Sequence, residues 1–420
     1  MGKAKKQITR RTFLKKSGIA AGAIGASTLI PGYHVNAAEP IRIGMTADLT
    51  GVLADFGFWL DRSAKAATAK INKAGGIGGR ELEFTVEDTE SKAPTGVRKT
   101  RKLIQRDKVD FVIGSHHSGI CLACNPIFKE LKTIGFPNGS STLITGAKGN
   151  SYVFRMNESV LHEVSSASDW AITQGKRWTL LGLDYAWGQD QCNQWAKRVE
   201  ALGGKAVDII MVPLGTDNMV PYLSRIKVDQ TDVIFMAFFS ASAIAFVKQA
   251  SNMGIFNKFK YVGTYDSVEG LDPSPFEGAF YHTPFPQRSA DVPAAIKPYD
   301  KMLRATIGVD AEGKDKKRGT PSGVAHDALG WENIHLLKDA VEATGYKNKR
   351  KHTRDVIKWL EGHETKTGSG YPQGGKLIRA EDHQAFAPIY IQQVVNGNWK
   401  VRATVPREKG FYKAQGNWKI

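Results

Sequence analysis

Hydrophobic residues occur along this chain in short runs that alternate with amphipathic stretches. Runs rich in Ile, Val and Phe are typical of buried strands, and apolar residues spaced three and four apart are typical of the helices that cover them. In the first part of the chain we expect strands at 41–46, 81–86, 109–114 and 134–136, with helices between them, the last at 119–132. Gly75-Gly76 is expected to end the first helix and Pro94 to begin the second.

A second series of the same kind follows. Its strands are expected at 178–183, 206–211, 232–237 and 259–263, and its helices at 188–202, 217–228 and 241–252. Strands that alternate with helices indicate a parallel sheet covered on both faces. Two such series predict an α/β protein of two doubly wound parallel-sheet lobes.

The last part of the chain adds helices at 322–343 and 353–361 and a hairpin. Two strand-like runs, 388–395 and 399–401, flank Asn396-Gly397-Asn398. Asn-Gly between such runs is a strong signal of a tight hairpin turn. The sequence alone does not assign these late elements to either lobe.

The first 38 residues have the composition of an export signal. Thr9–Lys15 fits the twin-arginine pattern, a small-residue apolar stretch follows, and Val35–Ala38 offers small residues to a signal peptidase. The apolar stretch is too short to span a bilayer, and no Cys lies at the cleavage point. We expect a twin-arginine signal peptide at 1–38 and a soluble periplasmic product without stable membrane insertion. The alternative is a cytosolic protein with a basic N-terminus.

Charge and length limit the remaining classes of function. The full chain is +17, and residues 1–38 hold seven basic residues and no acid, so the mature chain is +17 − 7 = +10. Its basic clusters, 314–318 and 347–351, lack the interleaved aromatics of a nucleic-acid groove, so no nucleic acid is expected as a partner. The 420 − 38 = 382 mature residues exceed one ordinary core. Three cysteines argue against a disulfide-built fold.

Polar loops follow several strands of the first series. Open parallel sheets bind ligands beyond the carboxyl ends of their strands, which here lead into 48–58, 88–91, 115–119 and 138–142. Ser118-Gly119 and Gly139–Thr142 offer hydroxyls and backbone N–H groups, and the first lies at a helix N-terminus. Such a terminus favours a carboxylate. The alternative is a helix cap and a Ser-rich turn that bind nothing.

His116, His117, Cys121 and Cys124 form a second cluster of reactive side chains. Imidazole and thiolate ligate zinc, which keeps an exported metal-dependent enzyme as an alternative. Buried structural cysteines are the interpretation we favour, and a redox-labile Cys121–Cys124 pair is a third. The loop 114–119 lacks the G-x-S-x-G spacing of a hydrolase, and the Gly-rich 75–79 follows a helix instead of a strand. We therefore expect neither catalysis nor a cofactor.

Several motifs, in order along residues 41–402, resemble the leucine/isoleucine/valine-binding protein family. They are Ile43–Gly51, Ala74–Arg80, Val112–Gly114 with Ser118-Gly119, Asp184–Gly188 and Asp382–Ala385. The resemblance implies a type I periplasmic binding protein, whose two lobes are joined by a three-crossover hinge and close on a ligand. It implies lobes at 39–155 plus 285–364 and at 156–284 plus 365–402, and a C-terminal tail at 403–420.

The resemblance also implies a function and a site. The function is that of the substrate-binding protein of an ABC transporter, with its permease as partner and a branched-chain or other amino acid, or an aromatic acid, as solute. Amide- or urea-binding and sensory receptors of the same fold are alternatives. The matching ligand-binding positions are Phe56, Ser118, Gly119, Ser140, Ser141, Tyr185, Phe239 (or Phe238) and Asp266.

These positions have distinct roles in the family. Ser118 and Ser141 match hydroxyls that hold the ligand carboxylate, and Gly119 and Ser140 match backbone groups beside them. Phe56, Tyr185 and Phe239 match aromatic residues around the ligand, although Phe239, like Trp59, has the alternative of an ordinary core residue. Asp266 falls at or one residue beyond the acid that pairs with an amino group. If Tyr265 faces the pocket instead, a simple or aromatic carboxylate is expected.

Overall fold

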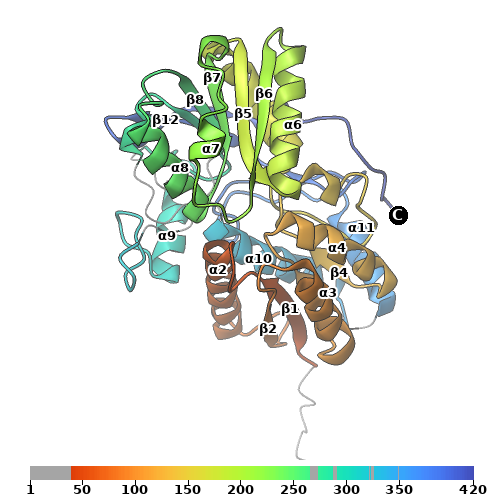
Figure 1. Cartoon of the computed structure of the whole chain (residues 1–420). Helices are drawn as coiled ribbons and strands as arrows, with labels where there is room; N and C mark the ends of the chain where they lie inside the picture. The colour runs from red at the N-terminus through yellow and green to blue at the C-terminus, as the bar shows by residue number, and fades with distance from the viewer. Residues whose placement is uncertain (1–38, 265–272, 287–290, 321, 323–325, 349) are drawn as a thin grey trace, which may run out of the picture. The chain divides into compact units, whose positions relative to one another are not determined.

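The computed structural model describes residues 39–420 apart from 265–272, 287–290, 321, 323–325 and 349. The predicted signal peptide and the pair Tyr265 and Asp266 lie outside the described residues. Figure 1 shows the order of the elements along the chain. Among the residues that the structure describes, no helix combines the length and the apolar character that crossing a bilayer requires.

The first lobe is built on a four-stranded parallel sheet of order β2-β1-β3-β4. Its strands are β1 (Ile41–Ala47), β2 (Leu82–Asp88), β3 (Phe111–Ile113) and β4 (Ile134–Phe136). Its helices are α2 (Ala54–Lys73), α3 (Ala93–Arg101), α4 (Ser118–Glu130), α9 (Lys297–Ile307), α10 (His326–Thr344) and α11 (Thr353–Leu360). Helices α2 and α10 approach closely because Gly330 has no side chain, and a Cβ there would overlap Leu60 of α2.

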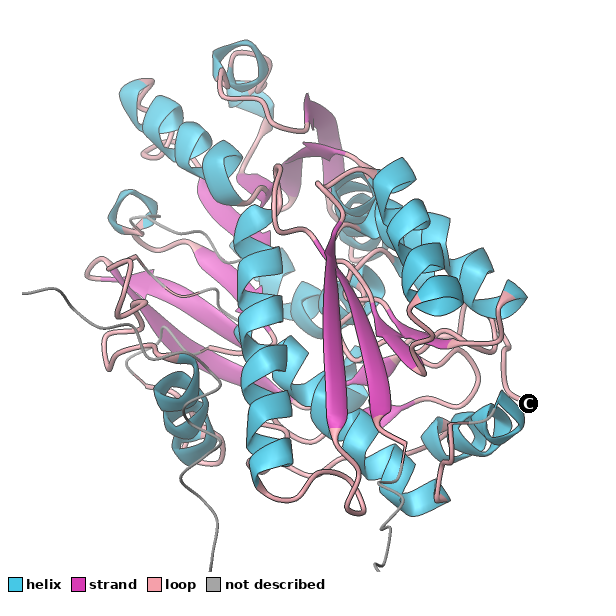
Figure 2. Cartoon of the chain, turned by 90° about the horizontal axis from the view of Figure 1, so that it is seen from below, coloured by secondary structure: helices cyan, strands magenta, loops and turns pink. Residues whose placement is uncertain are grey.

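The second lobe is built on a seven-stranded sheet of order β13-β12-β9-β8-β7-β5-β6. Its strands are β5 (Arg177–Asp184), β6 (Lys205–Pro213), β7 (Val233–Ala237), β8 (Lys260–Thr264), β9 (Phe280–Thr283), β12 (Ile389–Val395) and β13 (Asn398–Val405). Its helices are α5 (Val160–Ala171), α6 (Ala186–Ala201), α7 (Val220–Leu223) and α8 (Ser240–Asn252). Figure 2 shows helices on both sides of the strands, as the predicted doubly wound fold requires.

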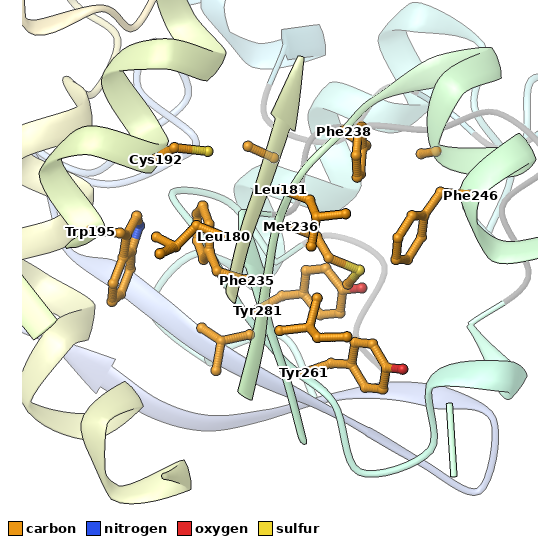
Figure 3. Close-up of a cluster of buried hydrophobic side chains, with 14 of the residues drawn as sticks. Leu180, Leu181, Cys192, Trp195, Phe235, Met236, Phe238, Phe246, Tyr261 and Tyr281 are labelled. Carbon is orange, nitrogen blue, oxygen red and sulfur yellow. The ribbon is translucent and has the colours of Figure 1, made fainter. Parts of the chain in front are cut away.

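The core of the second lobe follows from the two-residue period of its strands. Neighbours such as Phe235 and Met236 on β7 point to opposite faces of the sheet (Figure 3). Phe235 packs with Trp195 of α6, their ring centroids 5.1 Å apart, and all three side chains are buried. Both faces of β7 are therefore covered, which is why Val233–Ala237 is apolar and buried at every position.

The predicted hairpin is confirmed, and the structure assigns it to a lobe. Val395 of β12 pairs with Asn398 of β13, and the two loop residues between them, Asn396 and Gly397, both have positive φ (52° and 66°). This is the geometry that favours Asn-Gly in two-residue hairpin loops. Strand β12 pairs antiparallel with β9, so the hairpin extends the second sheet and makes that sheet mixed at one edge.

Most other predicted elements are confirmed, with one exception. Helix α2 ends at Lys73 before Gly75 and Gly76, and Pro94 lies in the first turn of α3. The helix predicted at 217–228 is wrong, because only Val220–Leu223 is α-helical. Within residues 224–230 only Ile226 is buried, so a longer helix would gain almost no packing there. Helices α5 and α9 and strand β9 were not among the expected elements.

The chain passes between the sheets three times, after β4, after β9 and again before β12. A short two-stranded sheet, β10 (Leu377–Ile378) with β11 (Ala385–Phe386), precedes the last passage. Ile378 and Ala385 belong to the buried cluster of the first lobe. The passages bring the loops at the carboxyl ends of both main sheets into contact.

Candidate ligand-binding site

A small pocket is enclosed by residues from both lobes. They are Leu53, Phe56, His116, Ser140, Tyr185, Trp187 and Phe239. They come from the loops and helix starts after β1, β3, β4, β5 and β7, which is where open parallel sheets bind ligands. The volume open to the centre of a water molecule is about 10 Å³, which is room for about one water. The described conformation is therefore closed around this point.

Aromatic rings form most of the pocket wall. The Phe56 ring lies edge-on to Phe239 at 5.1 Å and to His326 at 4.6 Å and stacks on His116 at 5.5 Å between centroids. Phe239 also contacts Tyr185 at 6.0 Å. The structure thus brings together the three aromatic residues expected in the site, Phe56, Tyr185 and Phe239. Phe239 is also part of the buried second-lobe core, whereas Trp59 lies in the first-lobe core and does not line the pocket.

The two predicted hydroxyl loops are in direct contact. The Ser141 N–H donates to Ser118 Oγ at 3.2 Å, and both residues are buried behind the lining residue Ser140. Ser140 Oγ accepts from Asn157 Nδ2 at 2.9 Å. The hydroxyls of Ser141 and Thr142 are buried and have no hydrogen-bond partner among the described residues. In the described part of the chain, two buried oxygens beside the pocket are therefore left without partners.

The N-terminus of α4 is capped by a histidine. His117 Nδ1 accepts from the N–H groups of Gly119 at 3.1 Å and Ile120 at 3.4 Å. Burial lowers the pKa of His117, and these bonds assign its proton to Nε2. The Gly119 N–H, which we expected to face a ligand, is therefore engaged within the protein in this structure. Nothing in the sequence indicated this cap, because histidine is not among the preferred capping residues.

A buried carboxylate holds the loop before α4. Asp48, fully buried after β1, accepts from Ser115 Oγ at 2.7 Å, from the His116 N–H at 3.1 Å and from the Thr89 hydroxyl. Burial raises the pKa of Asp48, and the bonds from Thr89 and Ser115 oppose that shift. Asp48 thereby holds the backbone of the loop between β3 and α4, which carries His116 and His117.

A buried guanidinium holds residues Gly139–Thr142, here called the serine loop, from the other side. Arg155 Nη1 donates to the carbonyls of Gly139 at 2.9 Å and Ser141 at 2.7 Å. Its Nε donates to Gln384 Oε1 at 2.6 Å, and its Nη2 donates to Thr145 Oγ1 at 3.0 Å. Burial lowers the pKa of Arg155. These four partners are uncharged oxygens, so the positive charge lies beneath the loop and favours an anion nearby.

Two hydrogen bonds beside the pocket connect the lobes. The Thr142 N–H donates to Asp190 Oδ2 of α6 at 2.5 Å, and Ser240 Oγ of α8 donates to Asp55 Oδ2 of α2 at 3.0 Å. Ser240 has a positive φ of 46°, which is unusual for a residue other than glycine. Strained backbone of this kind is often found at ligand-contacting positions.

The cysteines beside this site are free thiols in the structure. Cys121 Sγ donates to the Ser115 carbonyl at 3.0 Å, and Cys124 Sγ lies 3.2 Å from Thr100 Oγ1. Burial raises the pKa of Cys121 to about 12 and that of Cys124 to about 11. Both are therefore protonated at neutral pH, which agrees with buried structural cysteines. No group of three or more metal-ligating side chains occurs in the described part of the chain.

This chain is similar to known proteins in sequence and in fold. A relative from Brucella melitensis, a Leu/Ile/Val-binding protein homolog, is 22% identical over 89% of this chain and 88% of its own length. A solute-binding protein of an ABC transporter from Rhodopseudomonas palustris, in complex with 3,4-dihydroxybenzoic acid, has a TM-score of 0.74 at 24% identity. The alignment covers 88% of this chain and 98% of that one. These relatives are binding proteins.

A leucine-binding protein from Thermotoga maritima has the same fold, with a TM-score of 0.70 at 19% identity over 88% of this chain and 99% of that one. At these identities, the solved structures establish the fold and not the ligand. The family model for periplasmic binding proteins matches residues 40–398. The chain therefore belongs to the periplasmic binding protein family, in the group of the leucine/isoleucine/valine-binding proteins.

Proposed function

We propose that this protein is the substrate-binding protein of an ABC transporter and captures a small carboxylate-bearing solute between its lobes. The solute is an amino acid, branched-chain or other, or an aromatic acid. The observation that carries the proposal is the pairing of unsatisfied buried hydroxyls, Ser141 and Thr142, on one lobe with the aromatic side chains Tyr185 and Phe239 on the other.

The serine loop suits a carboxylate for energetic reasons. A buried hydroxyl without a hydrogen bond costs about 1–3 kcal/mol, which an incoming acceptor recovers. Ser141 and Thr142 each have such a hydroxyl, and the Arg155 guanidinium beneath the loop adds positive charge. A carboxylate that accepts from these groups gains charge-assisted bonds, which are stronger than neutral ones.

The apolar part of the solute would replace contacts that now close the pocket. A pocket with room for about one water cannot hold an amino acid or a benzoate, so binding requires the lobes to separate. The ring contact between Phe56 and Phe239 joins the two lobes and would open to admit a side chain or an aromatic ring. One structural neighbour is a leucine-binding protein, and another was solved in complex with 3,4-dihydroxybenzoic acid. Leucine and 3,4-dihydroxybenzoate both carry a carboxylate beside an apolar body.

Export and delivery complete the proposal. Residues 1–38 would direct the chain to the periplasm by the twin-arginine pathway, and the loaded protein would pass its solute to a membrane permease. The lobe boundaries given above and the role of Asp266 or Tyr265 remain predictions.

Calorimetric titration of residues 39–420 tests the proposal. The panel comprises L-leucine, L-valine, L-phenylalanine, benzoate, 4-hydroxybenzoate and 3,4-dihydroxybenzoate, with urea and acetamide as uncharged solutes. We expect saturable binding of at least one carboxylate and no chemical change in it. Binding of urea or acetamide alone would favour the amide-binding alternative, and no binding at all would contradict the proposal.

Serine variants locate the carboxylate. Ser141→Ala should weaken binding about 10- to 150-fold, because one charge-assisted bond of about 1.5–3 kcal/mol is lost. It should not destabilise the ligand-free protein, because the Ser141 hydroxyl has no hydrogen-bond partner among the residues that the structure describes. Tyr261→Phe, which removes another buried hydroxyl without a hydrogen-bond partner among the described residues, on β8, is the matched control and should leave affinity unchanged. If Ser141→Ala binds the solute as tightly as wild type, the solute carboxylate does not bind at Ser141.

A further inference from the structure

The segment after the last strand crosses from the second lobe to the first. Strand β13 ends at Val405 on the second sheet, and the family match ends earlier, at residue 398. The C-terminus lies beside α11 of the first lobe (Figure 1), where the Ile420 N–H donates to Glu361 Oε1 at 2.7 Å. We call residues 406–420 the strap.

The strap is first anchored beside the passages between the lobes. Its short 3-10 turn, Arg407–Gly410, packs on α5, and a Cβ at Gly410 would overlap His162 and Ser166. The Tyr412 hydroxyl lies 2.7 Å from Ser159 Oγ, which in turn caps α5. The strap thus meets the chain where it enters the second lobe.

Arg379 adds a second contact at the same level. Its guanidinium donates to the Tyr412 carbonyl and lies 4.7 Å from the ring centroids of both Tyr412 and Phe386. It is held in place by a bidentate pair with Asp382, at 2.8 and 2.6 Å. A fixed cation therefore clamps the strap to the segment that leads into the last passage.

The far end of the strap reaches the back of the serine loop. Trp418 Nε1 donates to the Thr145 carbonyl at 2.8 Å, and the Trp418 N–H donates to the Glu381 carbonyl at 2.6 Å. Thr145 Oγ1 accepts from Arg155 Nη2, and Arg155 also holds the Ser141 carbonyl. Three consecutive contacts therefore connect Trp418 to the loop that carries the unpartnered hydroxyls.

We propose that the strap positions the serine loop from outside the pocket, with Trp418 as its positioning residue. The affinity of the binding site then depends on a segment that does not line it. The effect of the strap on affinity rests on the proposed function, because it requires the solute to bind at the serine loop. The loop's own order depends on the strap whether or not a solute is bound.

Hydrogen exchange of the ligand-free protein, residues 39–420, tests the proposal. The reporting amides are Ile144, bonded to the Ser141 carbonyl, and Gly146, bonded to the Thr142 carbonyl. Trp418→Phe keeps a ring and removes the N–H, so both amides should exchange about two- to tenfold faster, as one neutral hydrogen bond implies. Amides of β5 should not change. Asn417→Ala, one residue away and exposed, is the matched control and should match wild type.

A variant that ends at Lys413 lacks Trp418 and both of its hydrogen bonds, to the carbonyls of Thr145 and Glu381. The Ile144 and Gly146 amides should exchange faster in this variant than in Trp418→Phe. Titration of 4-hydroxybenzoate and L-leucine into the same variants should show weaker binding by a similar factor. Unchanged exchange of Ile144 and Gly146 in Trp418→Phe would overturn the proposal, as would an equal increase throughout the protein. If exchange changes as expected but neither solute binds wild type, the strap's role stands and the choice of solute fails.

Discussion

The two sides of the pocket are built in opposite ways. On the first lobe, the loops Ser115–Ser118 and Ser140–Thr142 are held by hydrogen bonds to two buried charges, Asp48 and Arg155. On the second lobe, Tyr185, Trp187 and Phe239 are held mainly by packing, and all three lie in or against the core of the seven-stranded sheet. Directional bonds fix where a carboxylate can lie, whereas packing fixes the shape and size of what lies beside it.

This difference has an energetic consequence. Carbonyl oxygens of the serine loop that lose a buried donor stay unsatisfied. A substitution on the first-lobe side therefore destabilises the whole loop. Loss of an aromatic ring on the second-lobe side leaves a cavity next to the core and costs packing instead. Substitutions on the two sides should therefore lower stability and affinity in different ways.

The largest effect is expected at the aromatic side. Phe239→Ala should lower the free energy of unfolding by about 3–5 kcal/mol, because the ring is buried and contacts Phe56, Tyr185 and Trp187. Urea denaturation measures this loss. Phe239→Leu keeps most of the volume and should cost less than about 1.5 kcal/mol. A loss below about 1 kcal/mol in Phe239→Ala would mean that the ring is not part of the core.

On the polar side, Arg155→Met should lower the free energy of unfolding by about 3 kcal/mol. The substitution keeps a long apolar chain but leaves the carbonyls of Gly139 and Ser141 without their donor. Binding should weaken as well, because the loop loses its support. Arg402→Met, an exposed matched control, should stay within about 0.5 kcal/mol of wild type. Wild-type stability of Arg155→Met would refute the role given to the guanidinium.

The pH dependence tests His326 of α10, which contacts Phe56 and His116 on the first-lobe side of the pocket. Burial lowers the pKa of His326 to about 3. An unfolded histidine titrates near about 6.5, so below that pH the unfolded chain binds a proton that the folded chain does not. The free energy of unfolding should therefore fall by about 1.4 kcal/mol per pH unit from this group as pH drops from about 6.5 towards 3.

Comparison with His326→Gln isolates this contribution. Wild type should lose about 2 kcal/mol more than the variant between about pH 7 and 5, measured by urea denaturation. Above about pH 7 the difference between the two proteins should not depend on pH. If the free energies of unfolding of wild type and His326→Gln fall in parallel below about pH 6.5, His326 takes up its proton in the folded state as readily as in the unfolded state, and the prediction is wrong.

The smallest effect is expected where the two sides are bonded to each other. Ser240→Ala removes the 3.0 Å bond to Asp55 and should weaken solute binding about two- to tenfold, with little change in stability. Ser242→Ala lies on the same helix, and its hydroxyl bonds to the Thr216 carbonyl within the second lobe. This control should leave affinity unchanged. Equal effects of both substitutions on affinity would assign the loss to α8 itself.

Several features of the fold and site could be predicted from local sequence. The strand and helix alternation, the Asn396-Gly397 turn and the end of α2 follow from patterns within a few residues, and the structure confirms them. The hydroxyl loops could be placed because parallel strands present their carboxyl ends at one edge of the sheet. The failed helix at 217–228 shows the limit, because periodic apolar residues do not form a helix where little surface is buried.

The amino-acid sequence by itself determined the two α/β series, the hairpin and the positions of Ser118, Ser141, Tyr185 and Phe239 at loop or helix starts. Only the tertiary structure decided which lobe takes the hairpin, that His117 caps α4, and that Arg155 meets Gln384, 229 residues away, beneath the serine loop. The reason is physical. Periodicity and turn chemistry act between near neighbours, whereas the partners of a buried charge are selected by how distant segments pack.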